Sequence, residues 1–247
     1  MADPVLLIHG AWQGRWVWDR LVPMLEAAGL KPHAVDLPGN GADGSAPETA
    51  SLAAYLDHLD AVLETMPGPV SVVGHSGGGI VATALAERRS DRVARLAYIA
   101  GMMLPPATTF ADLLRRERAF DRGLVGIGAH LTWPKPGLVS AVPPDAGARV
   151  FLNDLPFASA IKLARKLTPQ GENGRSIAAN WTAGRFGRVP RLYVECLRDL
   201  SVAHELQRRM QEMVPGAWRV SLNAGHVPQA SMPGKLAAAL IPWLKGA

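Results

Sequence analysis

The sequence predicts an α/β protein with a mostly parallel sheet, flanking helices and one inserted helical cap. Two observations favour this class: short apolar runs alternate with stretches of helical periodicity towards both ends of the chain, and the region between them has weak strand character. The 247 residues suffice for one domain with a full hydrophobic core. We therefore expect a single domain whose core comprises residues 1–103 and 189–247, with a cap at 104–188.

The first part of the predicted core alternates strands with helices. Strands are expected where apolar residues run continuously, and helices where apolar residues recur every three to four positions. In chain order we expect a strand at 5–8, a helix at 16–28 closed by Gly29, a strand at 32–35, a helix at 51–66 capped by Ser51, a strand at 70–73, a helix at 77–89 and a strand at 93–100. Each connection is short enough for right-handed crossover packing.

The second part of the predicted core is shorter. It comprises a strand at 191–196, a helix at 204–213, a strand at 218–222 and a closing helix at 235–244. Residues 104–188 contain repeated prolines and short helical stretches at 110–120 and 158–167. A long segment of this kind between two parts of one sheet is typical of an insertion that follows a strand.

Charge and composition indicate which kinds of binding partner and which cellular location to expect. The net charge of +5 comes from scattered basic residues, and the densest group, at 115–118, contains a glutamate and is typical of a solvated helix face. No apolar run is long enough to cross a bilayer, and the N-terminal residues lack a basic region. The single cysteine, Cys196, cannot form an internal disulfide. We expect no nucleic-acid partner, no membrane association and a cytoplasmic location.

The nucleophile is predicted by the sequence Gly74-His75-Ser76-Gly77-Gly78, which follows a predicted strand and precedes a predicted helix. A serine in this G-x-S-x-G context occupies a strained turn that exposes its hydroxyl, and the flanking glycines provide clearance. A phosphate-binding turn would need G-x-G-x-x-G or a lysine followed by serine or threonine, and neither pattern is present. The motif predicts the α/β-hydrolase fold with Ser76 as the nucleophile.

A serine nucleophile needs an imidazole base that a carboxylate orients. Of the seven histidines, His226 follows the last predicted strand and falls at the same carboxyl edge of the sheet as Ser76. Asp199 follows the strand at 191–196, and the order Ser76, Asp199, His226 is that expected for this fold. Glu195 is the alternative acid, although it lies within the strand rather than beyond its end.

The oxyanion hole is predicted at two backbone amides. Gly77, directly after the nucleophile, supplies one N–H group, and the loop after the first strand supplies the other through Ala11. Trp12 is then expected to wall the substrate pocket, with a purely structural role as the alternative. Asp36 also follows a strand, and we interpret it as a residue that shapes its loop.

Several motifs resemble the plant methylesterase and hydroxynitrile lyase group of α/β-hydrolases and its bacterial relatives, which include pyrethroid-type esterases. They are residues 9–18 (HGAWQGRWVW), 21–23, 25–29, 74–76, 151–154 (FLND), Asp199 with 204–208, 225–226 and 231–233, and they fall in the family's order. The resemblance covers nearly the whole chain. It implies hydrolysis of a small-molecule ester without a cofactor or a metal.

The lyases of this group carry a threonine after the His-Gly pair and a lysine beside the catalytic histidine, whereas this chain has Ala11 and Val227. Both departures favour ester hydrolysis over the lyase reaction. The group also includes receptors that bind a small ligand, so a binding role stays an alternative. Four aromatic residues of the cap are candidates for the pocket wall and equally for the cap's own core: Trp133, Phe151, Phe157 and Trp181. They favour a small, largely apolar or aromatic ester. The natural ester and the oligomeric state, a homodimer included, stay open.

Overall fold

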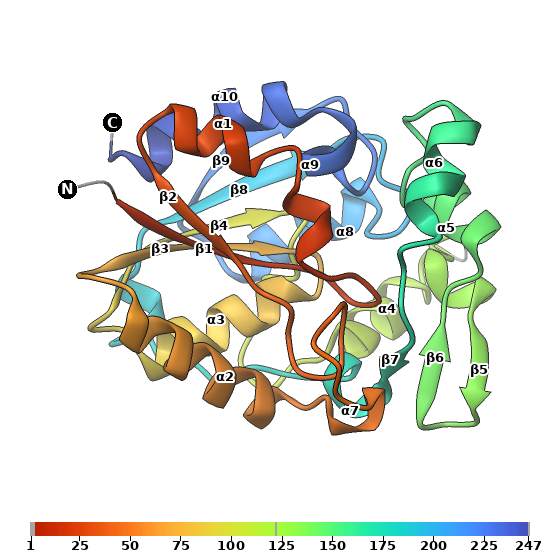
Figure 1. Ribbon diagram of the computed structural model, residues 1–247. Helices are drawn as coiled ribbons and strands as arrows, with labels where there is room; N and C mark the ends of the chain where they lie inside the picture. The colour runs from red at the N-terminus through yellow and green to blue at the C-terminus, as the bar shows by residue number, and fades with distance from the viewer. Residues whose placement is uncertain (1–2, 122, 247) are drawn as a thin grey trace.

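A six-stranded parallel sheet forms the centre of the computed structural model, which describes residues 3–121 and 123–246 (Figure 1). The strand order is β2-β1-β3-β4-β8-β9, and every neighbouring pair is parallel. The strands are β1 (Pro4–Ile8), β2 (Lys31–Ala34), β3 (Val70–His75), β4 (Val93–Ile99), β8 (Arg191–Cys196) and β9 (Ala217–Leu222). The predicted α/β class with a parallel sheet and flanking helices is confirmed.

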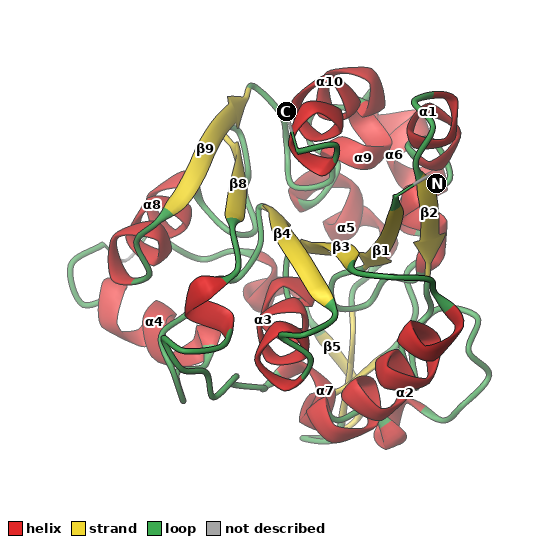
Figure 2. Cartoon of the chain, turned by 90° about the vertical axis from the view of Figure 1, so that its left-hand side faces the viewer, coloured by secondary structure: helices red, strands yellow, loops and turns green. Residues whose placement is uncertain are grey.

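Alternating side chains along β1 point into two separate apolar layers. Leu6 and Ile8 pack in a cluster with residues of α2 (Leu52–Thr65), α3 (Gly78–Arg88) and α8 (His204–Met213). Val5 and Leu7 pack in a second cluster with residues of α1 (Val22–Ala27) and α10 (Pro233–Leu244). Figure 2 shows α1 and α10 on one side of the sheet and α2 and α3 on the other. Burial on both faces explains why this strand is a continuous apolar run.

The helix expected at 16–28 is divided into two pieces. A 3-10 helix spans Arg15–Trp18, and α1 begins only at Val22, with Pro23 in its first turn. Proline lacks an amide proton and is therefore tolerated in a first turn but not within a continuous helix. The helix expected at 51–66 is α2, and its N-cap is Ser51, whose hydroxyl accepts a hydrogen bond of 3.1 Å from the N–H of Ala54.

The chain between β4 and β8 holds helices and also a small three-stranded antiparallel sheet, which the sequence did not predict (Figure 1). Its strands have two to four residues, and β5 contains Pro134, so their pattern is too short to stand out. The elements of this segment are α4 (Phe110–Glu117), β5 (Thr132–Lys135), β6 (Val139–Ala141), α5 (Pro144–Val150), α6 (Phe157–Ala164), β7 (Gln170–Gly171) and α7 (Glu172–Arg175).

The remaining short elements are the 3-10 helices Pro47–Thr49, Ile127–His130 and Phe186–Arg188, and α9 (Pro228–Ser231). The helix α9 follows the loop that leaves β9, at the carboxyl edge of the sheet. Although 91 residues separate the end of β4 at 99 from the start of β8 at 191, the two strands pair directly, with Leu96 opposite Arg191 and Ile99 opposite Val194. The insertion therefore leaves the sheet continuous.

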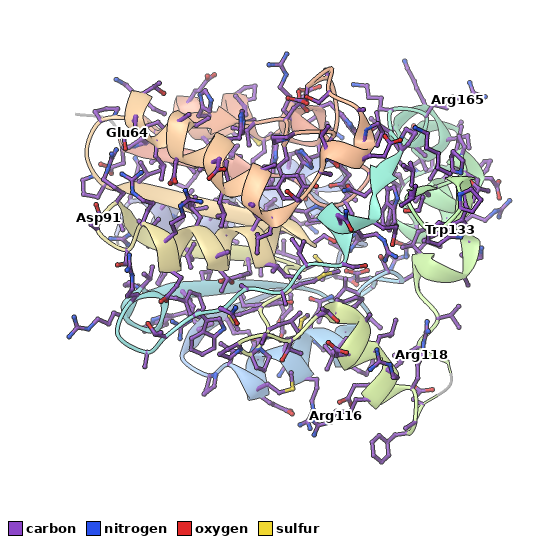
Figure 3. All side chains as sticks on the ribbon, turned by 90° about the horizontal axis from the view of Figure 1, so that it is seen from below. Glu64, Asp91, Arg116, Arg118, Trp133 and Arg165 are labelled. Atoms are coloured by element: carbon purple, nitrogen blue, oxygen red, sulfur yellow. The ribbon has the colours of Figure 1, made fainter. Side chains whose placement is uncertain are left out.

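The basic residues at 115–118 are engaged locally. Arg115 pairs with Asp112 at 3.1 Å, and Arg118 donates to the carbonyl oxygens of Leu124 and Val125 at 2.6 and 2.8 Å. Figure 3 shows Arg116 and Arg118 projecting from one part of the surface and Arg165 from another. Among the described residues, no helix is both long and apolar enough to cross a membrane.

Candidate active site

The turn after β3 holds Ser76 in a backbone conformation that side-chain-bearing residues rarely adopt. Its φ is +52°, in the left-handed region. Since β3 ends at His75 and α3 begins at Gly78, Ser76 lies on a sharp strand-to-helix turn. The carbonyl oxygen of Ser76 accepts hydrogen bonds from the N–H groups of Gly79 and Met102, each 2.9 Å long. These bonds hold the strained turn in place.

Close backbone packing requires glycine on both sides of Ser76. A Cβ atom on Gly74 would lie 2.7 Å from the carbonyl oxygen of Gly78, and one on Gly78 would lie 2.4 Å from that of His9. A Cβ atom on Gly10 would lie 2.8 Å from the Cβ of Ser76. The loop after β1 therefore packs directly against the turn that carries Ser76.

Asp199 and His226 form a buried hydrogen-bonded pair. Nδ1 of His226 lies 2.7 Å from Oδ2 of Asp199, and the residues are 1% and 4% exposed. Oδ1 of Asp199 accepts from the backbone N–H groups of Ser201 and Val202 at 2.7 and 2.9 Å, and Nε2 of Gln207 lies 3.3 Å from Oδ2. These donors hold the carboxylate in one orientation. Nδ1 of His226 therefore carries a proton, which leaves Nε2 available to accept one.

The loop that carries His226 is held from two directions. Oδ2 of Asp154 accepts hydrogen bonds from the N–H of Gly225 at 2.7 Å and from the hydroxyl of Ser231 at 2.8 Å. Nε2 of His75, the residue before Ser76, lies 2.8 Å from the carbonyl oxygen of His226 and donates to it. The strand that carries the serine and the loop that carries the histidine are thus joined directly.

The two predicted oxyanion amides lie next to each other. A Cβ atom on Gly77 would lie 3.8 Å from the backbone nitrogen of Ala11. Within the described part of the chain, neither of these N–H groups donates a hydrogen bond. Both residues line the same cavity as Ser76. The structure therefore leaves both amides available to a ligand in this cavity.

The cavity in front of Ser76 measures about 140 Å³ and is mostly apolar. Its apolar side chains include Leu37, Val81, Met102, Phe110, Leu114, Ile127, Phe151 and Ile177. A smaller polar group also lines it: Asn40, Tyr55, Gln170 and Arg175. A cavity of this size and composition fits a small organic molecule with one or two polar groups.

Trp12 and Phe151, both predicted as pocket residues, line this cavity. Trp12 has a φ of +59°, donates its backbone N–H to Oε1 of Gln170 at 3.2 Å, and donates its indole N–H to the hydroxyl of Ser140 at 3.1 Å. The ring of Phe151 stacks on that of His226, with 5.1 Å between the ring centres. Hydrogen bonds therefore fix Trp12, and ring stacking fixes Phe151, in the wall of the cavity that Ser76 also lines.

The other predicted aromatic wall residues are not among those that line the cavity. Trp133 lies on β5 and is 43% exposed, at the margin of the molecule (Figure 3). Trp181 packs on Phe186 and donates its indole N–H to the carbonyl oxygen of Leu104 at 2.9 Å. Phe157 is 48% exposed on α6. The short antiparallel sheet turns β5 outward, which the sequence alone did not predict.

Two further histidines near Ser76 have structural roles. Nε2 of His9 accepts the N–H of Leu37 at 3.1 Å, and Nδ1 donates to the carbonyl oxygen of Gly10 at 2.8 Å. Burial lowers the pKa of His9. Burial, reinforced by the neighbouring His226, also lowers the pKa of His75 well below its ordinary value. Both rings therefore bind a proton less readily in the folded chain than in the unfolded chain.

Glu195, the alternative acid, has other partners. Its carboxylate accepts hydrogen bonds from the Ser221 hydroxyl at 2.7 Å and from the Gln211 amide at 2.9 Å, and the Arg219 guanidinium lies 3.4 Å away. Asp199, not Glu195, contacts the ring of His226. Among the described residues, no cluster of three or more histidine, cysteine, aspartate or glutamate side chains could hold a metal ion.

Several residues that organise the site were not identified from the sequence. They are His75 and Asp154, whose contacts span 151 and 71 residues of sequence, and Gln207, whose contact with Asp199 spans eight. For Asp154, the motif at 151–154 marked the position as part of the family resemblance but did not indicate which group it binds.

Comparisons with known proteins identify the family of this chain. A model of the alpha/beta hydrolase family matches residues 5–239. Among curated proteins, a pyrethroid hydrolase from Sphingobium wenxiniae is 30% identical to this chain over 254 residues, which cover 96% of this chain and 85% of the relative. Methylesterase 7 from Arabidopsis thaliana is 28% identical over 249 residues, covering 96% and 94%.

Solved structures of other proteins have a similar fold. A crystal structure of the pyrethroid hydrolase PytH with BIF has a TM-score of 0.82 and 27% identity, and the match covers 99% of this chain and 98% of that one. A crystal structure of polyneuridine aldehyde esterase has a TM-score of 0.85 over 98% of this chain and 99% of that one, at 23% identity. At 23% identity, the match to polyneuridine aldehyde esterase shows similarity of fold alone.

Proposed function

This chain belongs to the alpha/beta hydrolase family and is a carboxylic ester hydrolase, and on that premise we propose that Ser76, His226 and Asp199 are its catalytic triad. The observation that carries the proposal is the buried contact of 2.7 Å between Nδ1 of His226 and Oδ2 of Asp199, at the sheet edge where Ser76 is held at positive φ. A carboxylate fixed by backbone donors orients an imidazole in the way a serine nucleophile requires.

In the first half of the proposed reaction, Oγ of Ser76 attacks the ester carbonyl carbon, and its proton passes to Nε2 of His226. The N–H groups of Ala11 and Gly77 donate to the oxyanion that forms. Collapse of this intermediate expels the alcohol, which takes the proton from His226. The acyl group remains bonded to Oγ of Ser76.

In the second half, water replaces the alcohol. Nε2 of His226 takes a proton from the water as its oxygen attacks the acyl carbon, and the same two amides stabilise the second oxyanion. Collapse returns the proton to Oγ of Ser76 and releases the carboxylic acid. No redox group or metal enters this cycle.

The proposed substrates are small esters whose acyl or alcohol part is largely apolar or aromatic. The size and apolar lining of the cavity support this class. Ala11 and Val227 occupy the positions at which lyases of the resembling group carry threonine and lysine, so cyanide release from mandelonitrile is not expected.

The test is hydrolysis of nitrophenyl esters by Ser76→Ala, with Ser45→Ala in an exposed loop as the matched control. We expect Ser76→Ala to lower kcat by about 10⁶, the usual cost of removing a triad serine, while Ser45→Ala keeps the parental rate. Comparable turnover by Ser76→Ala would contradict the mechanism. Tight ester binding by the parental chain without turnover would indicate a receptor instead.

A further inference from the structure

The peptide unit that joins Gly10 to Ala11 carries one of the two proposed oxyanion donors, the N–H of Ala11. Ala11, Gly77 and Ser76 all line one cavity. A backbone N–H stabilises an oxyanion only when it points at the place where the charge develops, at about 3 Å from it. The contacts that set the orientation of this peptide unit therefore bear on the proposed reaction.

The direction of the Ala11 N–H follows from the direction of the Gly10 carbonyl, because both groups belong to the same planar unit. The described residues contain no cis peptide bond. In a trans unit the C=O and N–H bonds point in opposite directions. A contact that fixes the carbonyl of Gly10 thus fixes the N–H of Ala11 without touching it.

The ring of His9 binds this carbonyl. Its Nδ1 lies 2.8 Å from the carbonyl oxygen of Gly10, and its Nε2 lies 3.1 Å from the backbone nitrogen of Leu37. A carbonyl oxygen only accepts and a backbone N–H only donates, so Nδ1 carries a proton and Nε2 does not. Both contacts require the same neutral tautomer, and one ring makes them at the same time.

The carbonyl of Gly10 has a second and weaker donor. It accepts the N–H of Gln13 at 3.4 Å, which is longer than an ordinary N–H to oxygen hydrogen bond. His9 is only 1% exposed, so water has almost no access to compete for its ring nitrogens. The bond from Nδ1 of His9 is therefore the stronger restraint on this peptide unit.

Leu37 anchors the other side of the ring. It lies in the loop after β2, 28 residues further along the chain than His9, and it is buried. Because both ring nitrogens of His9 are engaged, the ring cannot turn without breaking two hydrogen bonds. The loop after β2 thus holds the loop after β1 through this ring.

We propose that His9 is a positioning residue for the oxyanion site. Its Nδ1–H group holds the peptide unit between Gly10 and Ala11 in the orientation that presents the Ala11 N–H to the oxyanion. Since both ring nitrogens have backbone partners, His9 acts through this peptide unit and transfers no proton. The inference rests on the proposed function, because it assumes that an oxyanion forms at Ala11 and Gly77.

Two substitutions separate the roles of the two ring nitrogens. In His9→Asn the side-chain nitrogen replaces Nδ1, so the donor to Gly10 is kept and the acceptor for Leu37 is lost. In His9→Gln the side-chain oxygen replaces Nε2, so the acceptor for Leu37 is kept and the donor to Gly10 is lost. His33→Gln is the matched control, because His33 is exposed on β2. Thermal melting reports whether each variant folds.

We expect His9→Gln to lower kcat for a nitrophenyl ester by about 10- to 100-fold, because loss of one oxyanion donor costs about 10²–10³ and a misdirected N–H keeps part of its effect. KM should change little, since the oxyanion forms only in the transition state. His9→Asn should recover most of the lost rate, and His33→Gln should keep the parental rate.

A trifluoromethyl ketone gives a readout that a loss of stability alone does not change. Oγ of Ser76 adds to its carbonyl carbon, the serine proton passes to Nε2 of His226, and the carbonyl oxygen becomes an oxyanion without loss of any group. The inhibition constant should rise in His9→Gln by the same factor by which kcat/KM falls. Binding of the corresponding methyl ketone, which stays an intact ketone, should be unchanged.

Parental kcat in folded His9→Gln would overturn the positioning role, as would equal weakening of both ketones. A folded His9→Asn that loses as much kcat as expected for His9→Gln would also overturn it. In the parental chain, nitrogen NMR that places the His9 proton on Nε2 would contradict the proposed tautomer without any variant. Failure of the proposed function is distinguishable, since Ser76→Ala would then retain ester hydrolysis whatever the His9 variants do.

Discussion

Oδ2 of Asp154 accepts a hydrogen bond of 2.7 Å from the backbone N–H of Gly225, the residue immediately before His226. The same oxygen accepts the hydroxyl of Ser231 at 2.8 Å. A Cβ atom on Gly225 would lie 2.4 Å from Oδ1 of Asn153, so the segment between β4 and β8 packs closely on this loop. That segment therefore helps to position the proposed base as well as covering the cavity.

Replacing Asp154 by alanine is expected to lower kcat by about tenfold with little change in KM. The reason is that the N–H of Gly225 loses a charged acceptor, worth about 1.5–3 kcal/mol, while Asp154 is not a residue that lines the cavity. Steady-state kinetics with a nitrophenyl ester measures the effect. Asp154→Asn, which keeps one acceptor oxygen, should recover part of the rate.

The matched control for Asp154 is Asp145→Ala, on α5 of the same segment, where the carboxylate pairs with the exposed Arg149 at 2.9 Å. This variant should keep the parental kcat, because exposed ion pairs contribute little. An equal loss in both variants would mean that Asp154 has no specific part in positioning the His226 loop.

Asp199→Asn should lower kcat by about 10⁴, because an amide in place of the carboxylate lets Nδ1 of His226 lose its proton and leaves the wrong tautomer. Glu195→Gln is the control at the alternative acid. Since Glu195 binds Ser221 and Gln211 rather than His226, its replacement should lower the melting temperature but retain turnover. The reverse pattern of rates would identify Glu195 as the acid.

Gly78→Ala should destabilise the fold by about 1–3 kcal/mol, the usual cost of forcing an extra methyl group into a packed site. The added Cβ would lie 2.4 Å from the carbonyl oxygen of His9. Gly234→Ala in the first turn of α10 has open space around its Cβ and should be neutral or slightly stabilising. Denaturant unfolding of the two variants compares them directly, and equal free energies of unfolding would refute the steric argument.

Stability should decline as the pH falls below about 6.5. Burial lowers the pKa of both His9 and His75 from this ordinary value, so the unfolded chain binds more protons than the folded chain in that range. Linkage then gives a loss whose slope is at most about 1.4 kcal/mol per pH unit for each histidine, in the range between its folded and unfolded pKa values. His75→Asn should reduce the slope, whereas the exposed His130→Asn should not. Unfolding free energies between pH 8 and pH 5 provide the measurement.

The parts of the fold that follow from local pattern were predictable from the sequence. Strand β8 and helix α8 occupy the predicted residues 191–196 and 204–213, because both are periodic segments bounded by breaks in the pattern. The antiparallel sheet at β5–β7 was not predicted, because strands of two to four residues, one containing proline, carry almost no periodic signal.

The candidate catalytic residues could be predicted from their order along the chain. Contacts between segments that are distant in sequence could not be predicted. The sequence predicted a catalytic role for three residues because each follows a strand at one edge of a parallel sheet: Ser76, Asp199 and His226. The contact from Asp154 to Gly225 spans 71 residues and depends on how the inserted segment folds back on the core. The pairing of Asn40 with Tyr55 is likewise a result of packing.

Covalent labelling shows whether Ser76 is the nucleophile of this hydrolase. The chain is treated with a fluorophosphonate, the residual ester hydrolysis is measured, and the labelled peptide is identified by mass spectrometry. We expect a single adduct on Ser76 and a loss of hydrolysis in proportion to labelling, with no adduct in Ser76→Ala. An adduct on another residue, or hydrolysis that persists after complete labelling of Ser76, would contradict it.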